Sequence, residues 1–526
     1  MNDNQAEPLG FTAPPLPAPR SSELLRAPAD GVTVRMYRQG LGDCFLLALP
    51  TSDPGQSYYV LIDCGVLQGA PNGAANLNTV ARDIQAATGG QIHLLVATHR
   101  HADHISGFSL AKDVFTGMTI HNLWLGWAEN PADPQYKALW ERSNQALAAL
   151  RRAVQAQPAA MAGVSGVLDF AGDQWIAGEL GALGSDPMEP VRSLLKSGAM
   201  PEYRCPGEGP LALPAVAGRA AAEGVRLYVF GPPTSLAALG QMDPAGGTNE
   251  TYLARGLPNE ITAFLAAATD LQAALSDDER AARERSFPFQ AGLRIPREEA
   301  REEEFFRRRY GFDESGAAHP VPGKAGARDG EAGEAWRRID EDWLSSSEEL
   351  ALQLDNCINN TSLVLAMELV KTGRVLLFAA DAQVGNWLSW AELPDFALPE
   401  GGTVGIRDLL KRTVFYKVGH HGSHNATGRA LDDNTPWGLE LMTSPDLVAM
   451  IPVDEAFANQ VKHWPMPWPK LYERLGEVTK GRILRLDHGA PENAQPDAEW
   501  QAFMGQVEVT PLYVQYTVSE PRPHPS

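Results

Sequence analysis

Residues Thr98–His104 read T-H-R-H-A-D-H and follow the apolar run IHLLVAT, which is typical of a short strand buried on both faces. Catalytic groups commonly lie just beyond strand ends, where a rigid sheet fixes their positions. In an irregular loop, His99 and His101 can bind one metal while Asp103 and His104 reach a second. Imidazole nitrogens and carboxylate oxygens suit zinc, and also manganese or iron. Three histidines and an aspartate within six residues therefore predict a two-metal site rather than solvated loop histidines.

A second motif, Leu376–Asp381 (LLFAAD), has the pattern of a buried strand that ends in a carboxylate. An unpaired buried charge would be costly there unless it met a cation. We therefore expect Asp381 to bridge the two metals. The alternative is that Asp381 caps a helix beginning in AQVGNWL.

A third motif, Lys417–Asn425 (KVGHHGSHN), again ends a strand-like run and brings three histidines together. One of them should complete the second metal site, and we favour His421 over His420. The other, His420, is then a catalytic candidate that hydrogen-bonds a substrate oxyanion, as the backbone of the Gly-Ser turn could also do. Ser423, His424 and Lys417 are expected close to the substrate. Lys417 and the Arg100 side chain could each attract a phosphate or form an ion pair.

The rest of the chain shows the patterns of many short strands and a few helices. Strands are expected at 32–40, 43–50, 58–65, 225–232, 362–370, 374–382, 413–421, 446–453 and 482–487, and helices at 77–87, 134–162, 186–199, 259–275 and 470–478. Two strand-rich halves separated by helices and a long insertion indicate an α/β sandwich with mixed sheets.

The domain boundaries follow changes in composition. Residues 1–29 are rich in proline and alanine and are expected to form a disordered or loosely docked leader. One domain should span 30–518, with insertions at about 130–220 and 240–350. The second insertion contains dense mixed charge and the Gly/Ala-rich stretch His319–Ala335, which predicts a mobile loop.

Composition and charge limit the function classes. The chain has 526 residues, of which 44% are hydrophobic, and a net charge of −21. That charge argues against a surface that holds nucleic acid everywhere, although it is compatible with a local basic groove. Four cysteines without a C-x-x-C pair indicate neither a disulfide framework nor a zinc ribbon. Without a signal-peptide pattern or a long apolar run, the protein is expected to be soluble and cytoplasmic, with no membrane partner.

The ordered motifs carry a resemblance. T-H-x-H-x-D-H, LIDCG (Leu61–Gly65), AAD and the later histidine resemble the motifs of the metallo-β-lactamase superfamily. QGLGDCFLL (Gln39–Leu47), NNTSLVL (Asn359–Leu365) and VFYKVGHHGSH are similar to the ComEC/Rec2-type hydrolase domain of DNA-uptake competence proteins. The matches run from about 35 to 490, with about 110–355 largely unmatched. The resemblance implies an αββα sandwich that holds two divalent ions, Zn²⁺ or Mn²⁺.

The sequence departs from the superfamily at one ligand. The usual middle histidine, located before the Asp381 strand, has no counterpart, and Asn359 and Asn360 occupy that neighbourhood. The first metal site is therefore expected to be poorly filled, to bind an extra water, or to bind a harder ion such as Mn²⁺. Asn360 becomes a candidate for contacts to the substrate or to a metal ligand.

Function is inferred from the metals and the resemblance together. Two cations lower the pKa of a bridging water from about 16 towards 7, and Asp103 could orient the hydroxide and accept its proton. The subgroup is similar to nucleases and phosphodiesterases, so hydrolysis of DNA or RNA is the first hypothesis. The alternatives are a small-molecule hydrolase acting on a lactone, lactam, thioester or phosphoester, and a degenerate regulatory module.

The resemblance also suggests regulation, because members of this subgroup occur in bacterial defence loci with protease partners. Lys324 and Arg328 lie in the 319–335 stretch, which could act as a lid that cleavage opens or could be a passive solvated loop. Four tryptophans near the motifs could stack bases or pack in the core: Trp124, Trp127, Trp464 and Trp468.

Overall fold

The computed structural model describes residues 15–18, 23–136, 139–140, 186–196, 198–241, 295, 299, 302–306, 355–432, 434–493 and 496–519. The chain divides into two compact units. The first unit comprises Met1–Asn144, Gly166–Leu257 and Gln353–Ser526, and the second comprises Gln145–Ser165 and Pro258–Leu352. The expected lid at 319–335 and the predicted helix at 259–275 lie outside the described residues, as does most of the helix expected at 134–162.

The first unit contains an eight-stranded mixed sheet with the order β17-β18-β1-β2-β3-β5-β7-β8. Neighbours from β17 to β3 are antiparallel, and those from β3 to β8 are parallel. The strands are β1 (Val32–Tyr37), β2 (Phe45–Leu49), β3 (Tyr58–Ile62), β5 (Leu94–Ala97), β7 (Leu123–Gly126), β8 (Glu202–Arg204), β17 (Val507–Val509) and β18 (Tyr513–Val518).

A six-stranded mixed sheet has the order β16-β15-β14-β11-β10-β9. Its strands from β16 to β11 are parallel, and β11, β10 and β9 are antiparallel. They are β9 (Val225–Gly231), β10 (Val364–Leu369), β11 (Arg374–Phe378), β14 (Thr413–Lys417), β15 (Val448–Ile451) and β16 (Ile483–Arg485). Two short pairs complete the strands: β4 (Gln91–Ile92) with β6 (Thr119–Ile120), and β12 (Phe396–Ala397) with β13 (Thr403–Val404).

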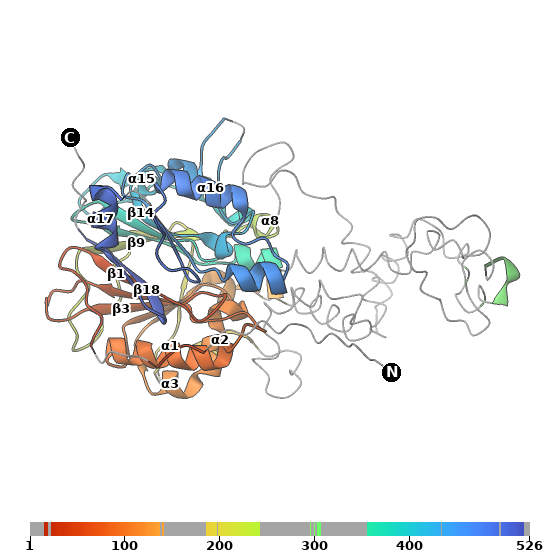
Figure 1. Cartoon of the computed structure of the whole chain (residues 1–526), viewed down its shortest axis with the longest axis horizontal. Coiled ribbons are helices and arrows are strands. Elements are labelled where there is room, and N and C mark those ends of the chain that lie inside the picture. The colour runs from red at the N-terminus through yellow and green to blue at the C-terminus, as the bar shows by residue number, and fades with distance from the viewer. Residues whose placement is uncertain are drawn as a thin grey trace. The chain divides into compact units, whose positions relative to one another are not determined.

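The two sheets pack face to face, because alternate residues of both contribute to one apolar core. Leu47 of β2 and Phe415 of β14 belong to this core, whereas Leu46 and Tyr416, on the opposite faces, belong to a second core that includes helix residues. Helices α1, α2 and α3 cover one side of the unit, and α15 and α16 lie on the other (Figure 1). The central strands are therefore buried on both faces, which explains why they read as continuous apolar runs.

Among the residues that the structure describes, the helices are short apart from α1. They are α1 (Gly73–Thr88), α2 (Ala102–Leu110), α3 (Lys112–Thr116), α7 (Glu189–Arg192), α8 (Leu236–Leu239), α14 (Val384–Ser389), α15 (Ile406–Lys411), α16 (Pro469–Val478) and α17 (Ala498–Met504). Among the helices that the structure describes, none is long and apolar enough to cross a membrane.

The expected α/β fold with mixed sheets is confirmed, and so are the strands predicted from 32 to 65, at 225–232 and from 362 to 487. The helix predicted over 186–199 is wrong beyond α7, because Leu195 forms a strand-like bridge to Ile120. The prediction also lacked α17, β17 and β18, although β18 pairs with β1 along its whole length. Near the expected leader, Leu25 is already buried and its N–H donates to Ala87, so docked chain precedes β1.

Candidate metal centre

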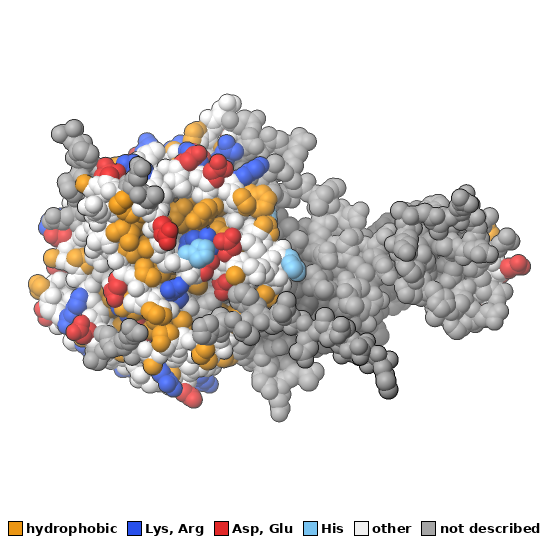
Figure 2. Space-filling model, viewed as in Figure 1, with side chains coloured by type: hydrophobic (Ala, Val, Ile, Leu, Met, Phe, Trp, Pro, Cys, Tyr) orange, Lys and Arg blue, Asp and Glu red, His pale blue; other side chains and the backbone are white. Residues whose placement is uncertain are grey.

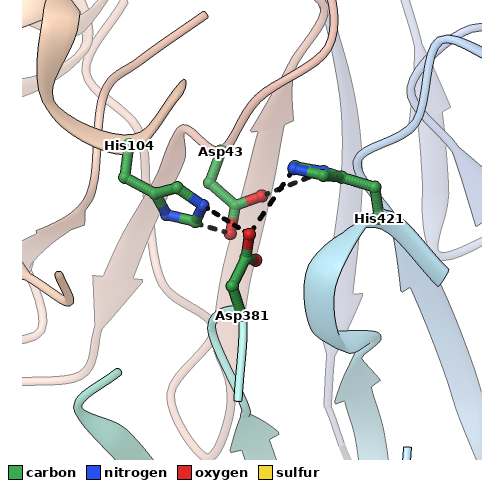
Figure 3. Close-up of side chains that lie close together, drawn as sticks. All are labelled: Asp43, His104, Asp381 and His421. Atoms are coloured by element: carbon green, nitrogen blue, oxygen red, sulfur yellow. Dashed lines mark ion pairs between the residues drawn. The ribbon is translucent and has the colours of Figure 1, made fainter. Parts of the chain in front are cut away.

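Four buried side chains lie together in segments next to strand ends of both sheets. They are Asp43, His104, Asp381 and His421, and one ligand atom from each lies within 4.8 Å of the others (Figure 3). Asp381 follows β11 and His421 follows β14 in the six-stranded sheet. His104 follows β5, and Asp43 precedes β2, in the eight-stranded sheet. Histidine and carboxylate ligands in this arrangement could hold a metal ion.

The first motif is partly helical, whereas an irregular loop was expected. Strand β5 ends at Ala97, the loop covers only 98–101, and Asp103 and His104 occupy the first turn of α2. Ile105 and Phe108 are three residues apart and both buried, so this segment forms a helix with an apolar face. A carboxylate in the first helical turn is stabilised by the helix dipole, which favours Asp103 at this place.

The LIDCG segment is the platform on which α2 rests. Cys64 N–H donates to the carbonyl of His104 at 2.7 Å, and Gly107 N–H donates to the carbonyl of Cys64 at 2.8 Å. A Cβ atom at Gly65 would lie 2.2 Å from the carbonyl carbon of Asp103. Only glycine permits this approach, so the last residue of the motif is a packing requirement.

Each of the two histidines in the cluster has one ring nitrogen held from outside. His104 Nδ1 lies 2.7 Å from Asp63 Oδ2, and its Nε2 lies 3.0 Å from Asp381 Oδ2. His421 Nδ1 donates to the carbonyl of Pro452 at 2.8 Å, and its Nε2 faces Asp103 Oδ2 at 2.8 Å. Such outer partners fix the tautomer of a metal-binding histidine. Both Nε2 atoms are therefore oriented towards the same carboxylates.

Asp43 lies on the outer side of the histidine rings. Its oxygens are 3.8 Å from the Nδ1 atoms of His104 and His421, and Lys417 Nζ lies 2.5 Å from Asp43 Oδ2 and 3.2 Å from Asp381 Oδ1. Lys417 is 1% exposed and thus in a buried ion-pair network. Sequence reasoning did not select Asp43. Its signal was a carboxylate just before a buried strand, whereas Asp381 was identified as a carboxylate just after one.

His99 and His101 form a neighbouring pair outside the group of four. His99 Nε2 lies 3.1 Å from His101 Nδ1, and the His99 and His104 ring centroids are 4.1 Å apart. His99 Nδ1 is held from outside by the hydroxyls of Thr98 and Ser362, at 3.1 and 3.4 Å. All six predicted metal-binding side chains therefore lie in one buried region.

The other predicted residues of the third motif surround this region. His420 is outside the group of four, and its Nδ1 accepts a hydrogen bond from Gln383 Nε2 at 2.9 Å. Ser423 Oγ lies 2.9 Å from the same nitrogen, so Ser423 supports His420. His424 is half-buried, with its ring edge towards Trp468.

Asn360 is part of the support behind Asp381. Its side-chain oxygen accepts from the N–H groups of Gln383 and Asn386, and its amide donates to the carbonyls of Leu239 and Gln241. All of its hydrogen-bonding groups are thereby used within the protein. These contacts give Asn360 a structural role, and none of them is a contact to a substrate.

The site loops contain backbone conformations that side chains rarely adopt. Asp63, Ala380, His420 and His421 have φ angles of 57°, 48°, 37° and 54°. Each such non-glycine residue costs about 1–3 kcal/mol and persists only where its surroundings determine it, commonly at functional sites. Four of these conformations in the segments around one cluster are consistent with a functional centre.

Charge interactions shift the pKa values of the clustered groups. Burial alone would lower the pKa of His104, but the carboxylates of Asp381, Asp43 and Asp103 raise it well above the usual value. The pKa of His421 is raised in the same way by Asp381 and Asp103. Burial would raise the pKa of Asp381, but His104 and Lys417 hold it well below its usual range. The carboxylates of the centre thus attract positive charge strongly.

Arg100 and the four candidate tryptophans make contacts within the protein. Arg100 donates to both carboxylate oxygens of Glu129, and its guanidinium stacks 3.2 Å from the ring centre of Trp140. This buried ion pair fixes Arg100, the residue between His99 and His101, within the loop 98–101. Trp124 and Trp127 are buried, and the remaining two candidates, Trp464 and Trp468, are partly buried against the core.

Comparison with family models, with curated proteins and with solved structures finds no match to this chain. The fold and the cluster therefore define the class: an α/β protein with two mixed sheets and a buried Asp/His group that could bind metal.

Proposed function

We propose that the chain is a metal-dependent hydrolase of the metallo-β-lactamase type that acts on phosphodiesters. The observation that carries this proposal is the spacing of four donor atoms: Nε2 of His104 and His421 and Oδ2 of Asp103 and Asp381. The four nitrogen–oxygen separations between these histidines and aspartates run from 2.8 to 3.7 Å. Ligands about 2.0–2.1 Å from a tetrahedral zinc ion are about 3.3 Å apart, so these donors fit one ion. Asp103 is therefore the better inner ligand, and Asp43 is better suited to pair with Lys417.

The charge of the region supports a second divalent ion. Five buried carboxylates belong to it, on Asp43, Asp63, Asp103, Asp355 and Asp381, and one buried ammonium, on Lys417. Burial raises the pKa of Asp43 and Asp355, so the full excess of four negative charges exists only when cations are bound, and two divalent cations would balance it. Among the described residues, Asp43 Oδ1, Asp103 Oδ1 and Asp381 Oδ2 also lack hydrogen-bond partners, which is costly for buried oxygens that bind nothing.

The protein groups around the ions have complementary roles in hydrolysis. When bound, divalent cations supply Lewis acidity and stabilise negative charge on the attacked and leaving oxygens. Asp103 Oδ1 can accept the proton of the attacking water. Burial lowers the pKa of His420 to about 3, and Gln383 donates to its Nδ1, so the neutral ring carries its proton on Nε2. Nε2 lies 3.5 Å from Asn359 Nδ2, and His420 can donate to a substrate oxyanion that takes the place of this contact.

The choice of a phosphodiester rests on the motif resemblance. The described surface in Figure 2 has acidic, basic and apolar side chains interspersed, and no continuous basic patch appears on that face. Long-range attraction of nucleic acid over this face is therefore weak, and the bound cations would have to supply most of the affinity for phosphate. A short or single-stranded nucleic acid that reaches the centre fits these conditions.

Cleavage assays test the proposal directly. Purified protein is incubated with Mn²⁺ or Zn²⁺ and with bis-nitrophenyl phosphate and single- and double-stranded DNA and RNA. We expect metal-dependent cleavage that falls at least about 100-fold in Asp381→Ala and His104→Ala, because both lose a ligand. Absence of cleavage of every phosphodiester by metal-loaded protein would sink the proposal.

The net charge of −21 favours one alternative, a hydrolase of small neutral substrates. A panel of chromogenic lactones, lactams, thioesters and phosphoesters separates the two, because turnover of carboxylic esters without phosphodiester cleavage identifies the alternative. Less than one tightly bound transition metal per chain would instead indicate a degenerate binding module.

A further inference from the structure

A buried acid beside His101 has no role in the centre described so far. Asp355 lies in the helical turn 355–360 and is 7% exposed. Its Oδ2 accepts a hydrogen bond from Asn359 Nδ2 at 3.0 Å. Its Oδ1 has no hydrogen-bond partner among the described residues and lies 3.5 Å from His101 Nε2. A buried carboxylate is costly unless it meets a donor or a cation, and the His101 ring is the group it faces.

The other histidines of the region show what this contact does. In His104 and His421, the Nδ1 atom is held from outside, by Asp63 and by the Pro452 carbonyl, and Nε2 points to the cluster. In His101 the two ring nitrogens have the opposite roles. Its Nε2 faces Asp355, and its Nδ1 lies 3.1 Å from His99 Nε2. The pair His99 Nε2 and His101 Nδ1 is thus oriented like the two inner nitrogens of the main cluster.

We propose that Asp355 positions His101 for a second divalent cation. Asp355 Oδ1 accepts a hydrogen bond from the protonated Nε2 of His101. The lone pair of His101 Nδ1 is then directed to the ion, together with the lone pair of His99 Nε2. As an acceptor, Asp355 also increases the basicity of the ring, so its effect on the ion passes through His101. The proposal rests on the proposed function, because it assigns a residue to the same centre. Asp355 acts through His101 and is a positioning residue.

Metal stoichiometry tests this role without an activity measurement. Mn²⁺ binding to the purified full-length chain is measured by equilibrium dialysis with elemental analysis. The wild type is expected to bind two ions per chain, and Asp355→Ala to retain one unchanged while the other binds about 10–100-fold more weakly. Asp355→Asn keeps an acceptor oxygen and should recover most of the loss. The matched control is Asp446→Ala, which removes a buried carboxylate that faces Arg374 and should leave both ions bound.

A double-mutant cycle with His101→Ala separates positioning from an independent contribution. Since Asp355 acts through His101, adding Asp355→Ala to His101→Ala should cause no further loss of Mn²⁺ affinity. Losses that add up, or wild-type binding by Asp355→Ala, would overturn the proposal. If Asp355→Ala does not fold, pulsed EPR spectra of the Cu²⁺-loaded wild type and of Cu²⁺-loaded Asp355→Asn are compared to test the proposal. The coupling of one remote imidazole nitrogen should change when its charged acceptor becomes neutral, and an unchanged coupling would overturn the proposal.

The two proposals fail in distinguishable ways. Wild-type protein that binds two ions but cleaves no phosphodiester contradicts the proposed function and leaves the role of Asp355 in place. Cleavage together with normal Mn²⁺ binding by Asp355→Ala contradicts only the role of Asp355. Fewer than two ions bound to the wild type overturns the Asp355 proposal directly.

Discussion

Lys417, with its buried ammonium group, is the residue of the centre whose substitution should destabilise the metal-free protein most. It contacts Asp43 at 2.5 Å and Asp381 at 3.2 Å and donates to the carbonyl of Ala380. Lys417→Met would leave two buried carboxylates without this partner, so we expect the metal-free protein to lose about 3–5 kcal/mol of unfolding free energy. Urea unfolding with and without Mn²⁺ measures the loss. Mn²⁺ should restore part of it, because a cation replaces the missing charge.

The control for this prediction is a lysine in an exposed ion pair. Lys371 Nζ lies 2.7 Å from Asp30, and its side chain is 72% exposed. Lys371→Met should cost at most about 1 kcal/mol, since water screens such pairs. Equal losses for the two variants would contradict the assignment of Lys417 to a buried network.

The raised pKa values of His104 and His421 predict a pH dependence of the metal-free protein. A histidine whose folded pKa exceeds the usual value of 6.5 binds its proton more tightly in the folded state. Its contribution to stability is complete below that pH and is lost as the pH rises through the folded pKa. Unfolding free energy of chelator-treated protein should therefore fall as the pH rises from about 6.5 through the folded pKa values of the two rings.

Metal binding should show the opposite trend over the same interval. The two rings must lose their protons to bind a cation, so Mn²⁺ affinity should increase with pH. Titrations at several pH values, followed by calorimetry, measure this. A metal affinity that is independent of pH would indicate that neither histidine is a ligand.

Between elements, the close contact of the LIDCG segment with α2 fixes the positions of Asp103 and His104. Gly65→Ala would place Cβ 2.3 Å from the backbone nitrogen of His104, so α2 must shift. We expect a loss of at least about 1–3 kcal/mol of stability, as for overpacked cores, and weaker metal binding. Thermal unfolding and Mn²⁺ dialysis measure the two effects.

Gly476 provides the comparison, because it lies inside α16 and a Cβ there meets nothing within 4 Å. Gly476→Ala should stabilise the protein by about 0.5–1 kcal/mol, since alanine loses less conformational freedom in a helix. Retention of full metal binding in Gly65→Ala would show that the α2 contact does not control the centre.

At the scale of the whole molecule, the donor atoms connect the two sheets. Asp103 and His104 follow β5 of the eight-stranded sheet, whereas Asp381 and His421 follow β11 and β14 of the six-stranded sheet. A bound ion should therefore stabilise both sheets together, by about 2.7 kcal/mol per site at a metal concentration of 100 times Kd. Hydrogen exchange with and without Mn²⁺ should show added protection in both sheets. Protection confined to one sheet would contradict a centre shared between them.

The sequence by itself determined the strand-rich α/β class and most of the histidines and carboxylates of the centre. Strands such as β5 and β11 are buried on both faces, so their apolar runs and the polar residues that end them are visible in the linear pattern. Asp381 and His421 could be predicted because each lies within a few residues of the end of such a strand, and His104 because it belongs to the histidine motif that follows β5. The pairing of β18 with β1 could not, because the register joins residues that are hundreds of positions apart.

Only the tertiary structure decided how the predicted residues divide between binding and support. Asp43 and Asp355 reach the region from segments far away in the chain, and no local spacing connects them to the histidine motif. Asn360 and Ser423, candidates by proximity in sequence, use their hydrogen bonds to hold other groups. The motif T-H-R-H-A-D-H predicts which groups meet. Which ring nitrogen faces inward depends on outer partners, such as Asp63 and Pro452, that only the packing of the two sheets brings into contact.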